Sequence, residues 1–120
     1  MRGLKSGFCE ILKRSITPLF LLYYFMLEKL SEQQISDALK ELPGWVYENG
    51  SIKKIFKTQN YPATMGFVTA IGGFCQKRNH HPDYVLMKFK EIEVSFSTHS
   101  AGGITQNDID IAKDIEKIPV

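Results

Sequence analysis

The sequence predicts an α+β domain in which helices cover one face of a four-stranded antiparallel sheet, in the order α-β-β-α-β-β-α. Two segments, 31–34 and 105–108, carry the residues of a helix capping box. Asn49-Gly50 forms a turn signal between two strand-like runs, and apolar and polar residues alternate over 91–98. Hairpin-linked strands separated by helices are typical of this fold class.

The composition is that of one compact soluble domain. The chain has 120 residues, of which 43% are hydrophobic and 23% charged, and its net charge is +2. This charge is too small to indicate direct nucleic-acid binding. Cys9 and Cys75 lack the CxxC spacing of a zinc site, so we expect no zinc site built on cysteines, no disulfide framework and a reducing, cytoplasmic location.

Residues 1–25 differ from the rest of the chain. Four basic residues accompany an apolar run at 19–27 that is too short to span a bilayer as a helix. The pattern is similar to a signal peptide, but no small-x-small cleavage site follows. An upstream start before a natural Met26, a targeting segment and a membrane-surface anchor therefore stay open. We expect a single domain over 26–120, without membrane association of its own.

The first helix begins at Ser31. Its hydroxyl can cap the helix, Gln34 completes a capping box, and Leu30 can pack against Ile35 as a hydrophobic staple. Pro43-Gly44 then ends the helical segment.

Two hairpins supply the predicted strands. Residues 45–47 and 52–56 flank the Asn49-Gly50 turn, although their pairing register stays open. Residues 84–89 and 91–98 form the second pair, and the alternation in the latter predicts one buried and one wet face.

A long helix is predicted over 61–77 between the hairpins. Because Pro82 cannot continue a helix, this one must stop near His80-His81. A helix that is apolar on more than one side predicts a subunit contact or a protein partner through its second stripe. The first stripe comprises Met65, Val68, Ile71 and Cys75, and the second comprises Phe67 and Phe74.

The three histidines are the candidate chemical groups. His80 and His81 lie where the long helix ends, and His99 lies where the last strand ends. Since the two ends of a hairpin are neighbours, all three can converge at one rim of the sheet. A zinc site and purely structural capping are alternatives, but general acid–base chemistry is favoured because imidazole changes its charge nearest to neutral pH.

Asp108 is the candidate acidic partner. Thr105 can cap the last helix, with Asp108 at its third position, so a local capping role is sufficient to explain this carboxylate. It could also orient His99 across the Gly102-Gly103 corner. Asp83, by contrast, is expected to be solvated.

The segments "HHPDY" at 80–84 and "STHSAGGITQNDIDIA" at 97–112, together with "LPGW" at 42–45, closely resemble the pterin-4a-carbinolamine dehydratase family. This family is also known as the dimerisation cofactor of a hepatocyte homeodomain factor. The resemblance covers about residues 27–118. It implies the same element order, a homodimer or homotetramer, and dehydration of a 4a-hydroxytetrahydropterin to the quinonoid dihydropterin in cofactor recycling. It implies no metal and no cofactor, because the pterin is the substrate.

The resemblance also implies roles for individual residues. His80 and His99 would handle protons at the departing hydroxyl and the ring nitrogen, His81 would hold the pterin, and Asp108 would orient a histidine. Further substrate contacts would come from flanking residues. The implied substrate-binding set is Asn79, His80, His81, Ser97, Thr98, His99 and Ser100.

Two other functions stay open. Some members of the family serve as dimerisation partners for other proteins, and here Phe67 and Phe74 on the 61–77 helix would form the contact. A member without pterin activity could act as an assembly factor for another enzyme, but the three intact histidines argue against this.

The chain departs from the family pattern at Gln76, where the family commonly has an acidic residue.

Overall fold

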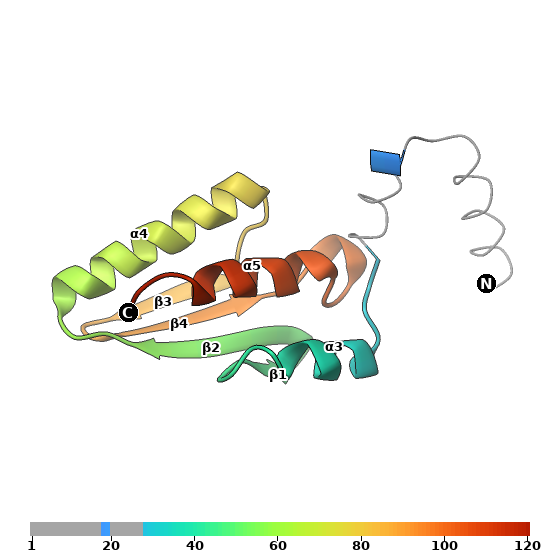
Figure 1. Ribbon diagram of the computed structural model, residues 1–120, viewed down its shortest axis with the longest axis horizontal. Coiled ribbons are helices and arrows are strands. Elements are labelled where there is room, and N and C mark those ends of the chain that lie inside the picture. The colour runs from blue at the N-terminus through green and yellow to red at the C-terminus, as the bar shows by residue number, and fades with distance from the viewer. Residues whose placement is uncertain (1–17, 20–27) are drawn as a thin grey trace, which may run out of the picture.

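The computed structural model describes residues 18–19 and 28–120, and the alternatives for 1–25 concern residues that lie almost entirely outside this part (Figure 1). Its helices are α3 (Glu32–Leu39), α4 (Tyr61–Arg78) and α5 (Gln106–Glu116), with a 3-10 turn η1 (His99–Ala101). Its strands are β1 (Val46–Glu48), β2 (Ser51–Lys57), β3 (Tyr84–Lys88) and β4 (Glu91–Phe96). Over these residues the predicted α+β order is confirmed.

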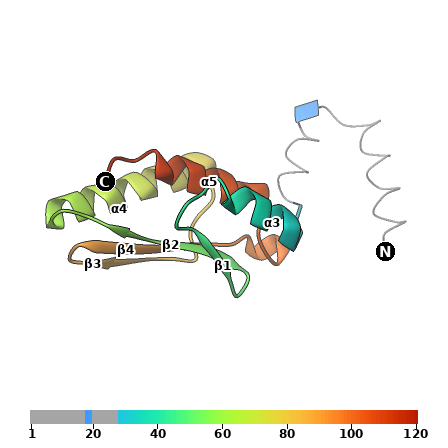
Figure 2. The same cartoon turned by 60° about the horizontal axis from the view of Figure 1, so that its bottom comes forward.

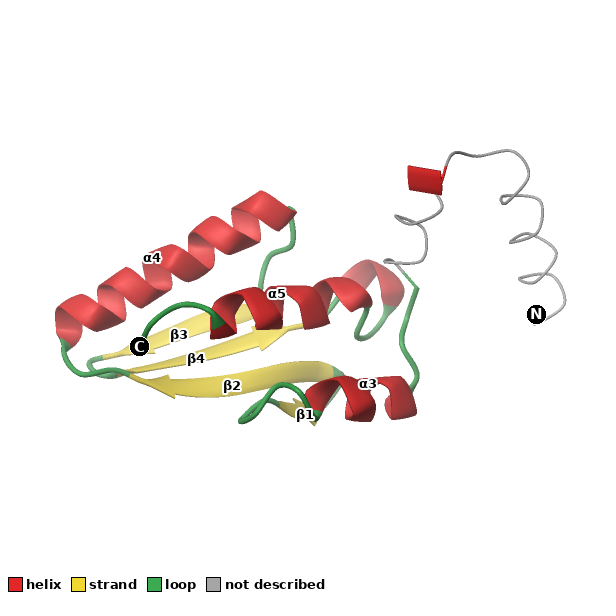
Figure 3. Ribbon diagram, in the orientation of Figure 1, coloured by secondary structure: helices red, strands yellow, loops and turns green. Residues whose placement is uncertain are grey.

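The four strands form one antiparallel sheet in the order β1-β2-β4-β3. The register of β3 and β4 is continuous from Tyr84↔Ser95 to Lys88↔Glu91. The helices α3, α4 and α5 lie on the same face of the sheet, which Figure 2 shows nearly edge-on and Figure 3 colours by element type. None of the helices within the described ranges is long and apolar enough to cross a membrane.

The turn between β1 and β2 positions one side chain of the site. Asn49 and Gly50 both have positive φ angles, of 52° and 77°, which is what a two-residue hairpin turn of type I′ requires. The turn pairs Glu48 with Ser51 and Tyr47 with Ile52, which settles the register that the sequence left open. Ser51 is thereby fixed at the start of β2, beside the end of β4.

The core lies between the sheet and the helices, and its composition corrects one prediction. Phe67 is only 3% exposed and packs against Phe56 with ring centroids 4.8 Å apart, while Phe74 packs half-buried against the same core. The second apolar stripe of α4 therefore faces inward and is not a free partner surface. The large apolar side chains that α4 leaves exposed are Tyr61 and Met65.

The end of α4 determines where the histidine pair begins. The helix stops at Arg78 because Asn79 adopts a left-handed conformation, with φ 51° and ψ 41°. Asparagine tolerates this region better than other residues with a side chain, apart from aspartate. The His80 N–H then bonds back to the Cys75 carbonyl at 3.0 Å, as in a Schellman motif. His80 is thus fixed directly beyond the helix.

Candidate active site

His80 and Asp108 form a buried pair beneath the end of the sheet. His80 Nε2 lies 2.6 Å from Asp108 Oδ1, and the two side chains are 10% and 0% exposed. The imidazole also stacks on the ring of Phe96, the last residue of β4, with centroids 6.2 Å apart. An imidazole held between a carboxylate and an aromatic ring has a defined orientation.

Asp108 is held in place by the start of α5. Its Oδ2 accepts from the Thr105 backbone N–H at 2.9 Å, as expected for the capping box, and from the Thr98 hydroxyl at 2.8 Å. Because the Thr98 proton points to Asp108, the Thr105 hydroxyl donates to Thr98 over 2.8 Å. The prediction that Asp108 could orient His99 is therefore wrong, because this carboxylate contacts His80 instead.

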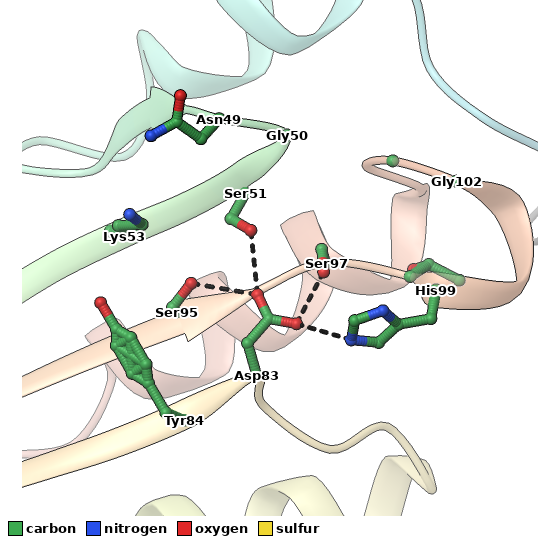
Figure 4. Close-up of a pocket in the computed structure, with 12 residues that line it drawn as sticks. Asn49, Gly50, Ser51, Lys53, Asp83, Tyr84, Ser95, Ser97, His99 and Gly102 are labelled. Atoms are coloured by element: carbon green, nitrogen blue, oxygen red, sulfur yellow. Dashed lines mark hydrogen bonds and ion pairs between the residues drawn. The ribbon is translucent and has the colours of Figure 1, made fainter.

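His99 pairs with a different carboxylate. His99 Nε2 lies 3.1 Å from Asp83 Oδ1, as Figure 4 shows, and the imidazole is 87% exposed. Asp83 as a whole is an exposed residue, but its side chain is only 20% exposed. The expectation that Asp83 is merely solvated was wrong, because the sequence does not reveal what the sheet brings against it.

Three serines surround the Asp83 carboxylate. Oδ1 accepts from Ser97 at 2.6 Å, and Oδ2 accepts from Ser51 at 2.9 Å and Ser95 at 3.0 Å (Figure 4). Burial by itself raises the pKa of Asp83. The hydrogen bonds from the three serines and the nearby His99 outweigh burial, so the pKa is lowered below its usual value.

The alternation of side chains along residues 97–99 explains why His99 pairs with Asp83 and not with Asp108. Successive side chains of an extended segment point to opposite sides. Ser97 and His99 point to Asp83, whereas Thr98 between them points to Asp108. The segment 97–99 therefore joins a buried pair on one side to an exposed pair on the other. Within residues 28–120, no hydrogen bond joins the ring of His80 or His81 to that of His99.

An open hollow of about 430 Å³ lies over the exposed pair, and its size suits a small organic ligand. Of the predicted site residues, Ser97, Thr98 and His99 line it. The rest of its lining consists of Asn49, Gly50, Ser51, Lys53, Asp83, Tyr84, Ser95, Gly102 and Gly103. A second hollow of about 440 Å³ lies beside β1 and β2 and has no histidine in its lining, so size alone does not select the site.

The other predicted site residues are not among those that line this hollow. His81 is exposed, and its Nε2 lies 3.5 Å from Gln76 Oε1. Ser100 is exposed on η1, and Asn79 caps α4. His80 and Asp108 do not line the hollow either, but Thr98, which does, donates to Asp108.

Comparison with known proteins gives the family. The model of the pterin 4 alpha carbinolamine dehydratase family matches residues 28–118, which is most of the chain and includes every candidate site residue. The chain belongs to this family. All three histidines, together with Asp83 and Asp108, therefore lie within the region that matches the pterin-4a-carbinolamine dehydratase family.

Individual relatives agree with the family match. A protein of Aquifex aeolicus named "putative pterin-4-alpha-carbinolamine dehydratase" is 40% identical over 93 residues, which are 78% of this chain and 93% of the relative. One of the same name from Sulfolobus acidocaldarius is 40% identical over 90 residues, 75% of this chain and 98% of that protein.

Solved structures show the same fold. The crystal structure of a transcriptional coactivator/pterin dehydratase from Brucella melitensis matches with a TM-score of 0.71 and 27% identity, over 74% of this chain and 96% of that one. A pterin dehydratase-like protein described as a RuBisCO assembly factor in the alpha-carboxysome matches with a TM-score of 0.51 and 12% identity, over 60% and 82%, which supports the fold alone.

In this family member, sequence reasoning missed Asp83 and the serines that bind it. One signal was available, because Ser95 and Ser97 share the polar side of a strand that ends beside His99. The approach of Ser51 carried no such signal, since it depends on the pairing of β2 with β4. Over the described ranges, no group of three His, Cys, Asp or Glu side chains has the arrangement of a metal site. The absence of a metal remains a prediction.

Proposed function

We propose that this chain is a 4a-hydroxytetrahydropterin dehydratase that returns an oxidised pterin to its recycling route as the quinonoid dihydropterin. The observation that carries the proposal is the pair of histidine–carboxylate contacts on the two sides of Thr98, next to a hollow of about 430 Å³. A bicyclic pterin ring fits a pocket of that size. The family membership supports the same reaction.

The reaction needs an acid and a base. The acid donates a proton to the 4a-hydroxyl group, so the C4a–O bond breaks and the oxygen leaves as water rather than as hydroxide. The base takes the proton from N5, and the electron pair of that N–H bond completes the C4a=N5 double bond. One proton is given and one is taken, so the two groups together are restored by a proton exchange with water. Each positioned group is worth about 10²–10⁴ in rate.

His80 and His99 are the residues we assign to these transfers. His99 lines the hollow and is 87% exposed, so it can meet a ligand directly. His80 is oriented by Asp108, whose other oxygen holds Thr98 in the wall of the hollow. We assign a pterin-holding role to His81, and further substrate contacts to Asn79, Ser97, Thr98 and Ser100.

The decisive experiment measures the dehydration of a 4a-hydroxytetrahydropterin, generated in situ, by the purified full chain. We expect wild type to exceed the spontaneous rate. His80→Gln and His99→Gln should each lower kcat by about 10²–10⁴-fold, because each removes a proton-transfer group. Lys40→Ala, at an exposed position beyond α3, is the control and should keep the wild-type rate. A wild-type rate equal to that of buffer would reject the proposal, as would histidine variants that match the control.

The three intact histidines argue against the alternative role as an assembly factor, and the role as a dimerisation partner of other proteins loses its predicted surface. That role relied on Phe67 and Phe74, which pack against the core. We therefore propose only the enzyme, acting in the cytoplasm without a further cofactor. Self-association as a dimer or tetramer would use the apolar side chains that α4 leaves exposed, Tyr61 and Met65.

A further inference from the structure

Asp83 is the carboxylate in the lining of the hollow, and its contacts are unusually complete. An ionised carboxylate has about four acceptor sites. Here Oδ1 accepts from Ser97 and lies 3.1 Å from His99 Nε2, and Oδ2 accepts from Ser51 and Ser95. These four partners come from β2, from β4, from the residue after β4 and from η1. The carboxylate therefore has little freedom to rotate.

The backbone of Asp83 is fixed as well. Its N–H donates to the Ser95 carbonyl at 2.7 Å, and the preceding Pro82 restricts the local chain. His99, in contrast, belongs to a three-residue turn and has 87% of its side chain exposed. An exposed imidazole loses its rotational freedom only where a contact holds it. The contact of His99 with Asp83 Oδ1, at 3.1 Å, supplies this restraint from a rigid base.

This contact also decides which ring nitrogen is available. An ionised carboxylate attracts a nitrogen that carries a proton and repels one that carries a lone pair, so a contact of 3.1 Å favours the form of His99 with its proton on Nε2. In a neutral imidazole the other nitrogen is then the acceptor. Nδ1 of His99 is therefore the atom left to exchange a proton with a ligand in the hollow.

We propose that Asp83 is the positioning residue of His99: it holds Nε2–H and thereby presents Nδ1 to the substrate. This assignment rests on the proposed dehydratase function for its kinetic consequence, but the pairing itself can be tested without the reaction. Asp83 acts through His99 and does not touch the reacting atoms. Its loss should therefore matter only while His99 is present.

The first test is spectroscopic. In ¹⁵N-labelled wild type at about pH 8.5, where imidazoles are ordinarily neutral, long-range ¹H–¹⁵N spectra should show His99 protonated at Nε2 and unprotonated at Nδ1. The Nε2–H proton should be visible, because the contact with Asp83 slows its exchange with water. Asp83→Ala should lose this protected signal. Asp37→Ala removes an exposed carboxylate on α3 and should keep it. A signal that survives in Asp83→Ala would overturn the pairing.

The second test is a double-mutant cycle on kcat. Asp83→Ala should lower kcat by about 10–10²-fold, as a displaced catalytic group does. In a His99→Gln background the same substitution should have no further effect, since the group that it positions is gone. An equal loss in both backgrounds would show that Asp83 supports the fold or the substrate directly, and would overturn the positioning role.

The two tests separate this inference from the proposed function. If wild type fails to dehydrate the pterin but Asp83→Ala loses the protected signal, the dehydratase proposal is rejected and the pairing stands. If wild type is active and the cycle is additive, the function stands and the positioning role is rejected. Should Asp83→Ala fail to fold, the isosteric Asp83→Asn replaces it in both tests. A neutral amide is a weaker acceptor than a carboxylate, so we expect changes in the protected signal and in kcat in the same direction, but smaller.

Discussion

His80 Nε2 lies 2.6 Å from Asp108 Oδ1, in a part of the core where neither side chain has appreciable contact with solvent. The segment directly after α4 is thus tied to the first turn of α5. The same carboxylate accepts from Thr98 and from the Thr105 backbone, so it joins the sheet, the helix cap and the histidine at one point. Substitutions at this point should affect stability and catalysis together.

Asp108→Ala should lower the free energy of unfolding by about 2–4 kcal/mol. It leaves donors on His80, Thr98 and Thr105 without their acceptor in a buried site, and each unsatisfied group costs about 1–3 kcal/mol unless water enters. The measurement is urea denaturation at neutral pH. Asp110→Ala, on the same helix but partly exposed, is the control and should change stability by less than about 1 kcal/mol. Equal effects of the two substitutions would contradict the buried network.

His81→Ala should raise KM by about tenfold and leave kcat within about threefold. The imidazole is exposed, and within residues 28–120 its one side-chain hydrogen bond is to Gln76, at the long distance of 3.5 Å, so it is free to contact a ligand. Gln76→Ala is the matched control and should leave both constants unchanged, since a contact of that length is weak. A loss of kcat as large as that of His80→Gln would instead place His81 among the proton-transfer groups.

Substitutions at Asn79 should separate its backbone role from substrate binding. With φ of 51°, Asn79→Gly should keep the stability of the protein, whereas Asn79→Ala should cost about 1 kcal/mol because of its β-carbon. If the amide also binds the pterin, both variants should raise KM equally. Thermal unfolding and steady-state kinetics measure the two effects. Equal stability of the Gly and Ala variants would count against the strained helix cap.

Protonation of Asp83 should make the protein less stable in acid. Its pKa is lowered in the folded state, so its contribution is complete above the unfolded value of about 3.9 and is lost as the pH falls through the folded value. Urea denaturation from about pH 6 to pH 2.5 should show a shallower decline for Asp83→Asn than for wild type. Part of the decline in stability should remain in both proteins, because a hydrogen bond from Arg78 lowers the pKa of Asp114 as well. Parallel curves would contradict a stabilised Asp83 carboxylate.

The sequence by itself determined the elements whose signals are local. The capping boxes at Ser31 and Thr105, and the turn at Asn49-Gly50, involve residues at most three positions apart, and all appear where they were predicted. The alternation over 91–98 likewise predicted that Ile92, Val94 and Phe96 are buried. Short-range hydrogen bonds and side-chain periodicity do not depend on the rest of the fold, so the sequence shows them directly.

Only the tertiary structure decided how the site is paired. The sequence placed Asp108 across a corner from His99, but the inward turn of Thr98 gives Asp108 to His80 and leaves His99 to Asp83. The environment of Asp83 also depends on Ser51, 32 positions away, which reaches it through the strand order of the sheet. Contacts between distant segments follow from the packing of whole elements, and no local pattern in the chain records them.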